Sequence, residues 1–264
     1  MRWVPKSIQR QWCHLSLVLP SSGRRVPCEQ CPLRALPSFR EFEPQELSFV
    51  SSFKTGELVA EVGTTLLSEG SHSAHLYTLL SGWAFRYKTL QDGRRQILNY
   101  MLPGDLVGLQ GSVIGEMQHS VEALTPLVLC VFQRNRLSEL FRNHPGLGFD
   151  ITWLAAQEER MLDDHLLSLG RRSATERAAY LIAFLYQRAA SVGLAARSLY
   201  VPITQMHVAD TLGLSIVHTN KTLRKLADRS LIRWLDRSCE VLDLPGLMDL
   251  AGWDGLPDRR RPLI

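Results

Sequence analysis

TQMHVADTLGLSIVHTNKTL, residues 204–223, predicts two short helices joined by a tight turn. Thr204 is a suitable N-cap for the first helix. The buried face of that helix is apolar: Val208, Ala209 and Leu212. Gly213 suits the left-handed position that ends the first helix, and the Ser215 hydroxyl can cap the second. This order of helix, turn and helix predicts a helix-turn-helix.

The second helix, expected over residues 216–228, exposes an unusual face. Thr219, Leu223 and Leu226 recur at spacings of four and three, which turns them toward the core. The outward face then combines aliphatic, polar and basic side chains: Ile216, Val217, Asn220, Lys221 and Arg224. Such a face fits the major groove of DNA, where aliphatic groups contact thymine methyls, asparagine pairs with adenine, and lysine reaches guanine or a phosphate.

Other predicted DNA contacts lie where the two helices begin. They are Thr204, Gln205, Ser215 and His218. Of these, Thr204, Ser215 and His218 are better placed for phosphates, which position a protein without specifying the base sequence. Residues 231–244, LIRWLDRSCEVLDL, then predict two strands joined by an Asp-Arg-Ser turn, which would form a wing. Basic residues gather on this part of the chain: Lys221, Arg224, Lys225, Arg229, Arg233 and Arg237.

The composition bounds the remaining possibilities. A chain of 264 residues is long enough for two domains, because domains usually have roughly 100–150 residues. A formal net charge of +4 permits a polyanionic partner. No apolar run reaches the roughly 20 residues that span a bilayer, and we expect neither a signal peptide nor a membrane partner. Five cysteines are an odd number, which favours reduced thiols in the cytoplasm.

Upstream, residues 53–134 predict short strands, because turn signals interrupt them at close intervals. Residues 96–102 and 127–132 have the length and apolar character of core strands. Gly82, Gly93 and Gly104 lie at turn positions where a positive φ would cost little. This region is therefore expected to form an all-β roll or barrel.

A helical pattern follows. Residues 137–144 predict a helix ended by Pro145-Gly146, and residues 147–169 a long helix with an apolar stripe wide enough to be buried on two sides. One side would face the roll. The other would face a second subunit, or else the whole helix packs within its own chain. Residues 170–173 form a hinge, and Ser173 with Glu176 forms a capping box for a helix over residues 174–190.

With these motifs in view, the chain resembles the Crp/Fnr family of bacterial transcription regulators over nearly its whole length. The resemblance rests on LPGDLVG (residues 102–108), ATER (174–177) and the helix-turn-helix (204–223). It implies an α+β fold with a cyclic-nucleotide-binding-type β roll (a double-stranded β-helix or jelly roll), a long dimerisation helix and a C-terminal winged helix-turn-helix. The expected parts are an N-terminal extension (1–27), a β-roll sensor domain (28–145), a dimerisation helix and hinge (146–172), a DNA-binding domain (173–252) and a tail (253–264).

The resemblance also bears on the ligand. Family members that bind cyclic AMP carry a Gly-Glu-Leu segment and an Arg-Ser pair, whose arginine neutralises the cyclic phosphate. Here the corresponding residues are Gly108-Leu109-Gln110 and His119-Ser120. Because both the carboxylate and the guanidinium are missing, we do not expect this chain to bind a cyclic nucleotide.

The Fnr branch, which senses oxygen through a [4Fe-4S] cluster, is the more similar branch. Its pattern is Cys-x2-Cys-x5-Cys with a fourth cysteine on a strand of the roll. Cys28, Cys31 and Cys130 match three of the four positions, but Pro37 stands at the remaining one. Four thiolates suit such a cluster, so Cys13 or a residue other than cysteine would have to complete the set. The alternatives are a thiol switch, a zinc site, or a vestigial site.

Enzyme classes find little support, because the chain has no P-loop, G-x-S-x-G, H-E-x-x-H or G-x-G-x-x-G motif. The sequence predicts a regulator that binds palindromic promoter DNA as a homodimer, under control of a signal, such as oxygen or redox state, at the roll. RNA polymerase is a further expected partner. Two alternatives remain: a sensor of haem, through His72, His75 or His119, or of another small ligand, and a regulator with a vestigial sensor that is controlled by its abundance.

Overall fold

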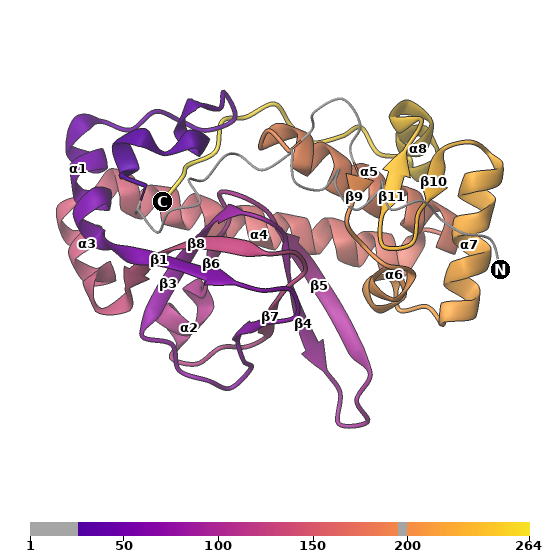
Figure 1. Ribbon diagram of the computed structural model, residues 1–264, viewed down its shortest axis with the longest axis horizontal. Coiled ribbons are helices and arrows are strands. Elements are labelled where there is room, and N and C mark those ends of the chain that lie inside the picture. Colours follow the sequence, from indigo (N-terminus) through magenta and orange to yellow (C-terminus); the bar gives the residue numbers. More distant parts are fainter. Residues whose placement is uncertain (1–25, 195–199) are drawn as a thin grey trace, which may run out of the picture.

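The computed structural model describes residues 26–194 and 200–264, which form a β roll, a long helix and a smaller helical domain (Figure 1). This order confirms the predicted α+β architecture. Within the described residues, no helix combines the length and apolar character that crossing a membrane requires.

The roll consists of two antiparallel four-stranded sheets. The first has the order β1 (Lys54–Ala60), β8 (Leu127–Gln133), β3 (His75–Ser81), β6 (Leu106–Val107). The second has the order β2 (Thr65–Leu67), β7 (Ser120–Ala123), β4 (Ala84–Thr89), β5 (Arg95–Met101). The two core strands predicted over residues 96–102 and 127–132 are thus confirmed as β5 and β8.

Glycine makes the turns of the roll possible. Gly82, Gly93 and Gly104 have φ angles of 90°, 85° and 90°, as predicted. At Gly82 a side chain would also collide with its surroundings, because a Cβ there would lie 2.2 Å from the carbonyl oxygen of Pro126. The close approach of the turn at Gly82 to the backbone of Pro126 therefore requires glycine at this position.

Short helices flank the roll. They are the 3-10 helices η2 (Cys28–Gln30), η3 (Pro32–Ala35) and η4 (Arg134–Arg136), and the α-helices α1 (Pro44–Phe53), α2 (Leu109–Ile114) and α3 (Leu137–Asn143). The sequence predicted α3. It did not predict α1, although Phe49, Val50 and Phe53 recur at helical spacing, or α2, which lies within the region expected to form only strands.

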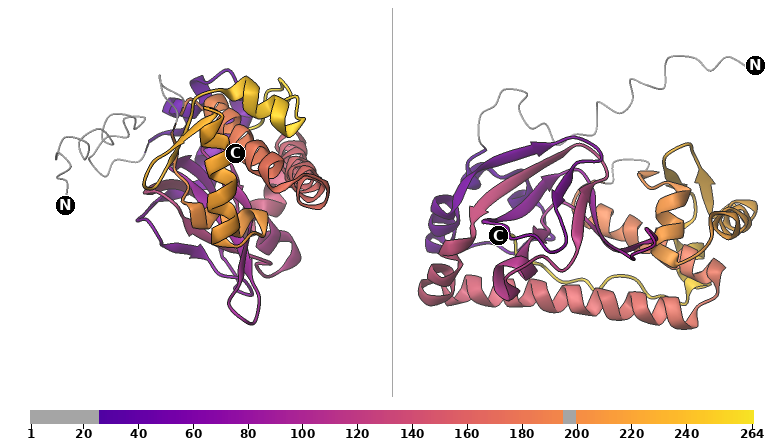
Figure 2. Two further views of the ribbon diagram at one scale, coloured as in Figure 1. Left: turned by 90° about the vertical axis from the view of Figure 1, so that its right-hand side faces the viewer. Right: turned by 90° about the horizontal axis from the view of Figure 1, so that it is seen from below.

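The predicted long helix is α4 (Pro145–Arg171), which extends beneath both the roll and the helical domain (Figure 2). Pro145 begins this helix, because proline lacks only an N–H group that the first turn leaves unpaired anyway. Its apolar stripe has two sides: Ile151, Leu154 and Met161 are buried, whereas Leu162 and Leu166 are 37% and 70% exposed.

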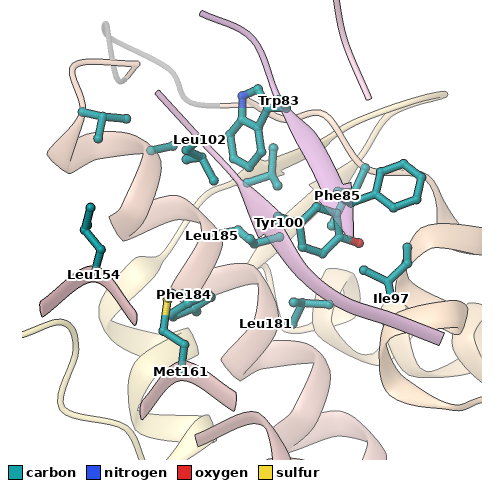
Figure 3. Close-up of a cluster of buried hydrophobic side chains, with 14 of the residues drawn as sticks. Trp83, Phe85, Ile97, Tyr100, Leu102, Leu154, Met161, Leu181, Phe184 and Leu185 are labelled. Carbon is teal, nitrogen blue, oxygen red and sulfur yellow. The ribbon is translucent and has the colours of Figure 1, made fainter. Parts of the chain in front are cut away.

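The helical domain begins with α5 (Ala174–Ser191), whose capping box between Ser173 and Glu176 is present as predicted. It continues with β9 (Tyr200–Val201), α6 (Gln205–Leu212), α7 (Ile216–Asp228), β10 (Ile232–Trp234), β11 (Cys239–Val241) and α8 (Leu244–Ala251). Figure 3 shows Leu181, Phe184 and Leu185 of α5 in one cluster with side chains of the roll and of α4. The roll and the helical domain therefore share a hydrophobic core.

Candidate nucleic-acid interface and cysteine site

Helices α6 and α7 form the predicted helix-turn-helix, with the predicted caps. The Thr204 hydroxyl accepts a hydrogen bond from the backbone N–H of His207, with 3.2 Å between the atoms. Gly213 ends α6 in the left-handed conformation, at φ 63°. The Ser215 hydroxyl accepts from the N–H of His218 at 3.3 Å and begins α7. Local sequence thus determines both helix boundaries, because each uncapped N–H group would cost free energy.

The outward face of α7 agrees with the sequence prediction. Thr219, Leu223 and Leu226 are buried, at 0%, 3% and 0% exposed. Ile216 and Val217 are 37% and 61% exposed, although both are aliphatic. The polar members of this face are also exposed: Asn220, Lys221 and Arg224. Within the described residues neither of these two basic side chains forms an ion pair, so both are available to an anionic partner.

The start of α6 carries a feature that the sequence did not reveal. His207 occupies the third position of a capping box, and its Nδ1 accepts a hydrogen bond from the backbone N–H of Thr204 at 3.2 Å. Glutamate and glutamine are the usual residues there, so the S/T-x-x-E/Q signal missed this histidine. Thr204 and Gln205 are half-buried, while Ser215 and His218 are exposed.

The wing has three strands rather than the predicted two. Strands β10 and β11 pair as expected, and β9 joins as the third strand, in the order β10-β11-β9. Its basic residues, Arg233 and Arg237, are exposed. Cys239 is fully buried, so its side chain packs in the core beneath the wing.

The helix-turn-helix is docked on the roll through α6. Arg95 of β5 forms an ion pair with Asp210 at 2.8 Å. The Gln96 side-chain amide donates to the carbonyl oxygen of Thr211 at 2.8 Å, and the Tyr100 and Thr211 hydroxyls lie 2.9 Å apart. No sequence pattern indicated these contacts, which join residues more than a hundred positions apart.

Three of the four predicted metal-ligand cysteines come together. Cys28, Cys31 and Cys130 line one small chamber, with the cations Lys54 and Arg34 on its wall. Burial raises the pKa of Cys28, and it raises the pKa of Cys130 to about 12, with Lys54 acting in the opposite direction. These two thiols are therefore protonated at neutral pH. Cys13 lies outside the described residues.

The chamber does not fit the [4Fe-4S] cluster of the Fnr branch. Among the described residues, no group of three or more His, Cys, Asp or Glu side chains is placed to hold a metal ion. Pro37 occupies the position of the missing ligand and is exposed. The space beside the thiols is lined by Leu263 and Ile264, two buried apolar residues from a distant part of the chain.

A larger cavity, of about 450 Å³, lies between the roll and α4. Its wall includes Leu109 and His119, the two residues that replace the expected carboxylate and guanidinium. Burial, with a smaller effect of Arg86, lowers the pKa of His119 to about 4. His119 therefore does not supply the permanent positive charge of the arginine that it replaces. His72 and His75 do not line this cavity.

The chain is similar to known proteins in sequence and in fold. The model of the cyclic nucleotide-binding domain matches residues 57–144, and that of the Crp-like helix-turn-helix domain matches residues 176–250. The nitrogen fixation regulation protein FixK of Bradyrhizobium diazoefficiens is 30% identical over 224 residues, which cover 82% of this chain and 90% of that protein. The transcriptional activator protein FnrL of Cereibacter sphaeroides is 28% identical over 238 residues, covering 87% and 95%. Among solved structures, FixK2 from Bradyrhizobium japonicum superimposes with a TM-score of 0.66 at 26% identity, covering 74% of this chain and 96% of that one.

Proposed function

Because the chain belongs to the Crp/Fnr family of DNA-binding transcription regulators, we propose that it binds two-fold-symmetric promoter DNA as a homodimer, under control of a thiol-directed signal at the roll. The observation that carries the DNA contact is the outward face of α7. Ile216 and Val217 are exposed beside Asn220 and Lys221, a combination that suits base edges in a major groove. The proposed phosphate contacts are Thr204, Ser215 and His218, with Gln205 and Arg224 beside them.

The exposed side of α4 supports the homodimer. Leu162, Leu166 and Leu167 form an exposed apolar stripe, with exposed fractions of 37%, 70% and 56%. Apolar side chains at this spacing on a long helix favour pairing with the same helix of a second copy. Two recognition helices about 34 Å apart would then reach successive turns of the major groove.

The cysteine chamber is the proposed sensor. Its three thiols lie beside two cations, Lys54 and Arg34, which would stabilise a thiolate once the chamber opens to water. Oxidants that enter the cell would oxidise these thiols directly, so that no iron-sulfur cluster would be needed. Such a signal acts on DNA binding only if it favours one arrangement of the two domains over another. Helix α4 continues to Arg171 instead of ending at residue 169 as predicted, so only Arg172 and Ser173 separate it from α5, and these two residues are the proposed hinge between the domains.

A small ligand is a second candidate for the signal, supported by the 450 Å³ cavity between the roll and α4. The side chains of Arg86 and Glu158 line it and form an ion pair at 2.5 Å, so a polar ligand would find both charges there. Haem would be a ligand of the same kind. Of His72, His75 and His119, only His119 lines this cavity. We also propose that the protein acts in the cytoplasm and that RNA polymerase is a further partner.

Selection from a pool of random double-stranded DNA tests the DNA contact directly. The expected product is an inverted repeat with half-sites about one helical turn apart, bound by two chains. Light scattering of the purified complex gives the number of chains. Selection of no sequence, or one chain on a single half-site, contradicts the proposal.

Purification without oxygen tests the sensor. We expect a visible spectrum with neither broad cluster absorption nor a haem Soret band, and DNA affinity that changes when the reduced protein is treated with peroxide. Broad absorption that fades in air, together with bound iron, would instead establish a cluster despite Pro37. Affinity that is insensitive to peroxide would favour the small-ligand signal or a vestigial sensor.

A further inference from the structure

Residues 253–264 lead from the DNA-binding domain back to the roll (Figure 1, yellow). They lie beyond residue 250, where the match to the helix-turn-helix domain model ends. At their start, the Trp253 ring meets the Tyr180 ring edge-on at 5.4 Å, and the Leu256 N–H donates to the Gln187 side chain at 2.8 Å. The segment is thus fastened to α5 before it crosses to the roll.

Arg261 fastens the other end through its backbone and its side chain. Its N–H donates to the carbonyl of Ser38 at 2.8 Å, and its carbonyl accepts from Arg40 at 2.9 Å, as one bridge of a parallel sheet. Its guanidinium donates to Asp105 Oδ1 at 2.7 Å and to the Gly104 carbonyl at 3.1 Å. Paired backbone groups and a buried charge partner mark a built peptide site rather than a loose contact.

Beyond Arg261 the segment enters the cysteine chamber. Leu263 and Ile264 are 2% and 4% exposed, and both line the same cavity as Cys28, Cys31 and Cys130. The Thr78 hydroxyl donates to the backbone oxygen of Ile264 at 2.5 Å, and Arg34 donates to that of Leu263 at 3.4 Å. The apolar side chains therefore occupy space that any group added to these sulfurs would need.

One carboxylate links this segment to the DNA-binding domain. Asp105 Oδ1 accepts from Arg261, while its Oδ2 accepts from Arg188 of α5 at 2.6 Å. The side chains of Asp105 and Arg188 are 6% and 7% exposed. Loss of Arg261 would leave this carboxylate with one cation instead of two, and so alter the electrostatics of the contact between roll and α5.

We propose that residues 256–264 are an intramolecular latch, bound at the Ser38–Arg40 edge of the roll, whose end shields the cysteine thiols. Covalent modification of Cys28 or Cys130 and docking of the latch exclude each other. The chamber is thereby a modification site for thiol-directed reagents, and the latch connects it to the DNA-binding domain. This inference rests on the proposed function for its effect on DNA, but the shielding of the thiols stands independently of DNA.

Maleimide labelling tests the shielding. The thiol adds across the C=C bond of N-ethylmaleimide. The S–H bond and the C=C π bond break, a bond forms between Sγ and one carbon, and the proton ends on the neighbouring carbon. Removal of residues 254–264, or the milder Arg261→Ala, should speed the labelling of Cys28 and Cys130 by roughly tenfold or more. The reason is that a charge-assisted hydrogen bond lowers the population of a locally opened state by about that factor. Site-resolved mass spectrometry measures each rate.

The chain supplies the controls. Arg260 is exposed beside Arg261, so Arg260→Ala should leave the rates unchanged. Cys239 is fully buried in the wing, and its labelling would reveal general unfolding rather than release of the latch. Equal labelling of Cys28 and Cys130 in the unaltered chain and in Arg261→Ala, with Cys239 protected in both, rejects the latch.

A two-by-two comparison tests the connection to DNA. Affinity for the selected DNA is measured for labelled and unlabelled protein, with the latch present and with residues 254–264 removed. Labelling is expected to change affinity by roughly 5–150-fold in the full chain, the usual range of coupling between sites, and not in the shortened one. An equal change in both chains, or none in the full chain, overturns the connection. Failure of all four forms to bind DNA rejects the proposed function and leaves the labelling result as the test of the latch.

Discussion

Asp105 of the roll and Arg188 of α5 form a buried ion pair, with 2.6 Å between carboxylate and guanidinium. Arg188 also donates to the backbone carbonyl of Tyr100 at 2.7 Å, so its charge is satisfied entirely by the roll. Asp105 belongs to the LPGDLVG motif that made the family recognisable in the sequence. The same motif is therefore where the roll and the helical domain are held together.

Asp105→Asn should destabilise the protein by about 3–5 kcal/mol, because it leaves buried Arg188 and half-buried Arg261 without their common counter-charge. Thermal denaturation measures the loss. Asp92→Asn is the matched control, since the ion pair of Asp92 with Arg94 is exposed and should contribute little to stability. Equal effects of the two substitutions would show that the pair does not hold the domains together.

Acid should act on the same pair. Burial alone would raise the pKa of Asp105, but Arg188 and Arg261 outweigh it and hold that pKa below its usual range. A lowered pKa contributes stability that is present above the unfolded value of about 3.9 and is lost as the pH falls through the folded value. The contact between roll and α5 should thus survive mild acid and fail only below about pH 4, as followed by hydrogen exchange.

His207 should make the protein less stable in mild acid. Burial, with a smaller effect of Arg95, lowers its pKa to about 4, and its ring lies 5.3 Å from that of Phe85 on the roll. Between about pH 6.5 and 4 the unfolded chain binds a proton that folded His207 refuses, so stability falls as the pH falls.

His207→Gln should reduce this loss by of order 1 kcal/mol, allowing for partial exposure, because glutamine keeps the capping box and does not titrate. Urea denaturation at several pH values measures it. Burial also lowers the pKa values of His119 and His165 to about 4, so part of the dependence of the free energy of unfolding on pH should remain in this variant. An unchanged slope, or the same change in His218→Gln on exposed α7, would contradict the assignment.

Leu166→Glu should separate the proposed dimer. Leu166 is 70% exposed in the single chain, so the substitution should change the stability of that chain by no more than about 0.5 kcal/mol. Light scattering should show monomers, and affinity for the inverted repeat should fall by roughly 100-fold or more because the half-sites are no longer bound together. Leu90→Glu, at 59% exposed Leu90 on the roll, is the control and should remain dimeric.

Lys221→Ala should weaken binding to the selected DNA by about 1–3 kcal/mol if the lysine reads a base. Titrations at several salt concentrations distinguish the alternative, in which it contacts a phosphate and the salt slope falls by about 1. Lys88→Ala, on the roll, provides the comparison. No change in either affinity or salt slope would remove Lys221 from the interface.

Val217→Glu should change which DNA sequences are selected, while the affinity for DNA of unrelated sequence should stay unchanged. Glutamate accepts a hydrogen bond from cytosine, which valine cannot do. Repetition of the selection from random DNA with this variant is the measurement. Val59→Glu, at a similarly exposed valine of the roll, should select the original sequence, and an unaltered preference in Val217→Glu would show that α7 is not the reading helix.

The sequence predicted the helix-turn-helix well because its signals are local. A cap, a left-handed glycine and an apolar period all act within a few residues, and they set α6, the turn at Gly213 and α7. The cysteines were harder. Their order along the chain indicated a common site, but the space between them depends on Leu263 and Ile264, which arrive from more than a hundred residues away.

The amino-acid sequence by itself therefore determined the family, the order of the domains and the face of α7 that is exposed. Only the tertiary structure decided that α6 rests on β5, that Asp105 holds two arginines, and that residues 256–264 shield the thiols. The physical reason is the range of the interactions. Caps and periodicity act between neighbours in the chain, whereas ion pairs and shared cavities depend on which distant surfaces meet in the folded protein.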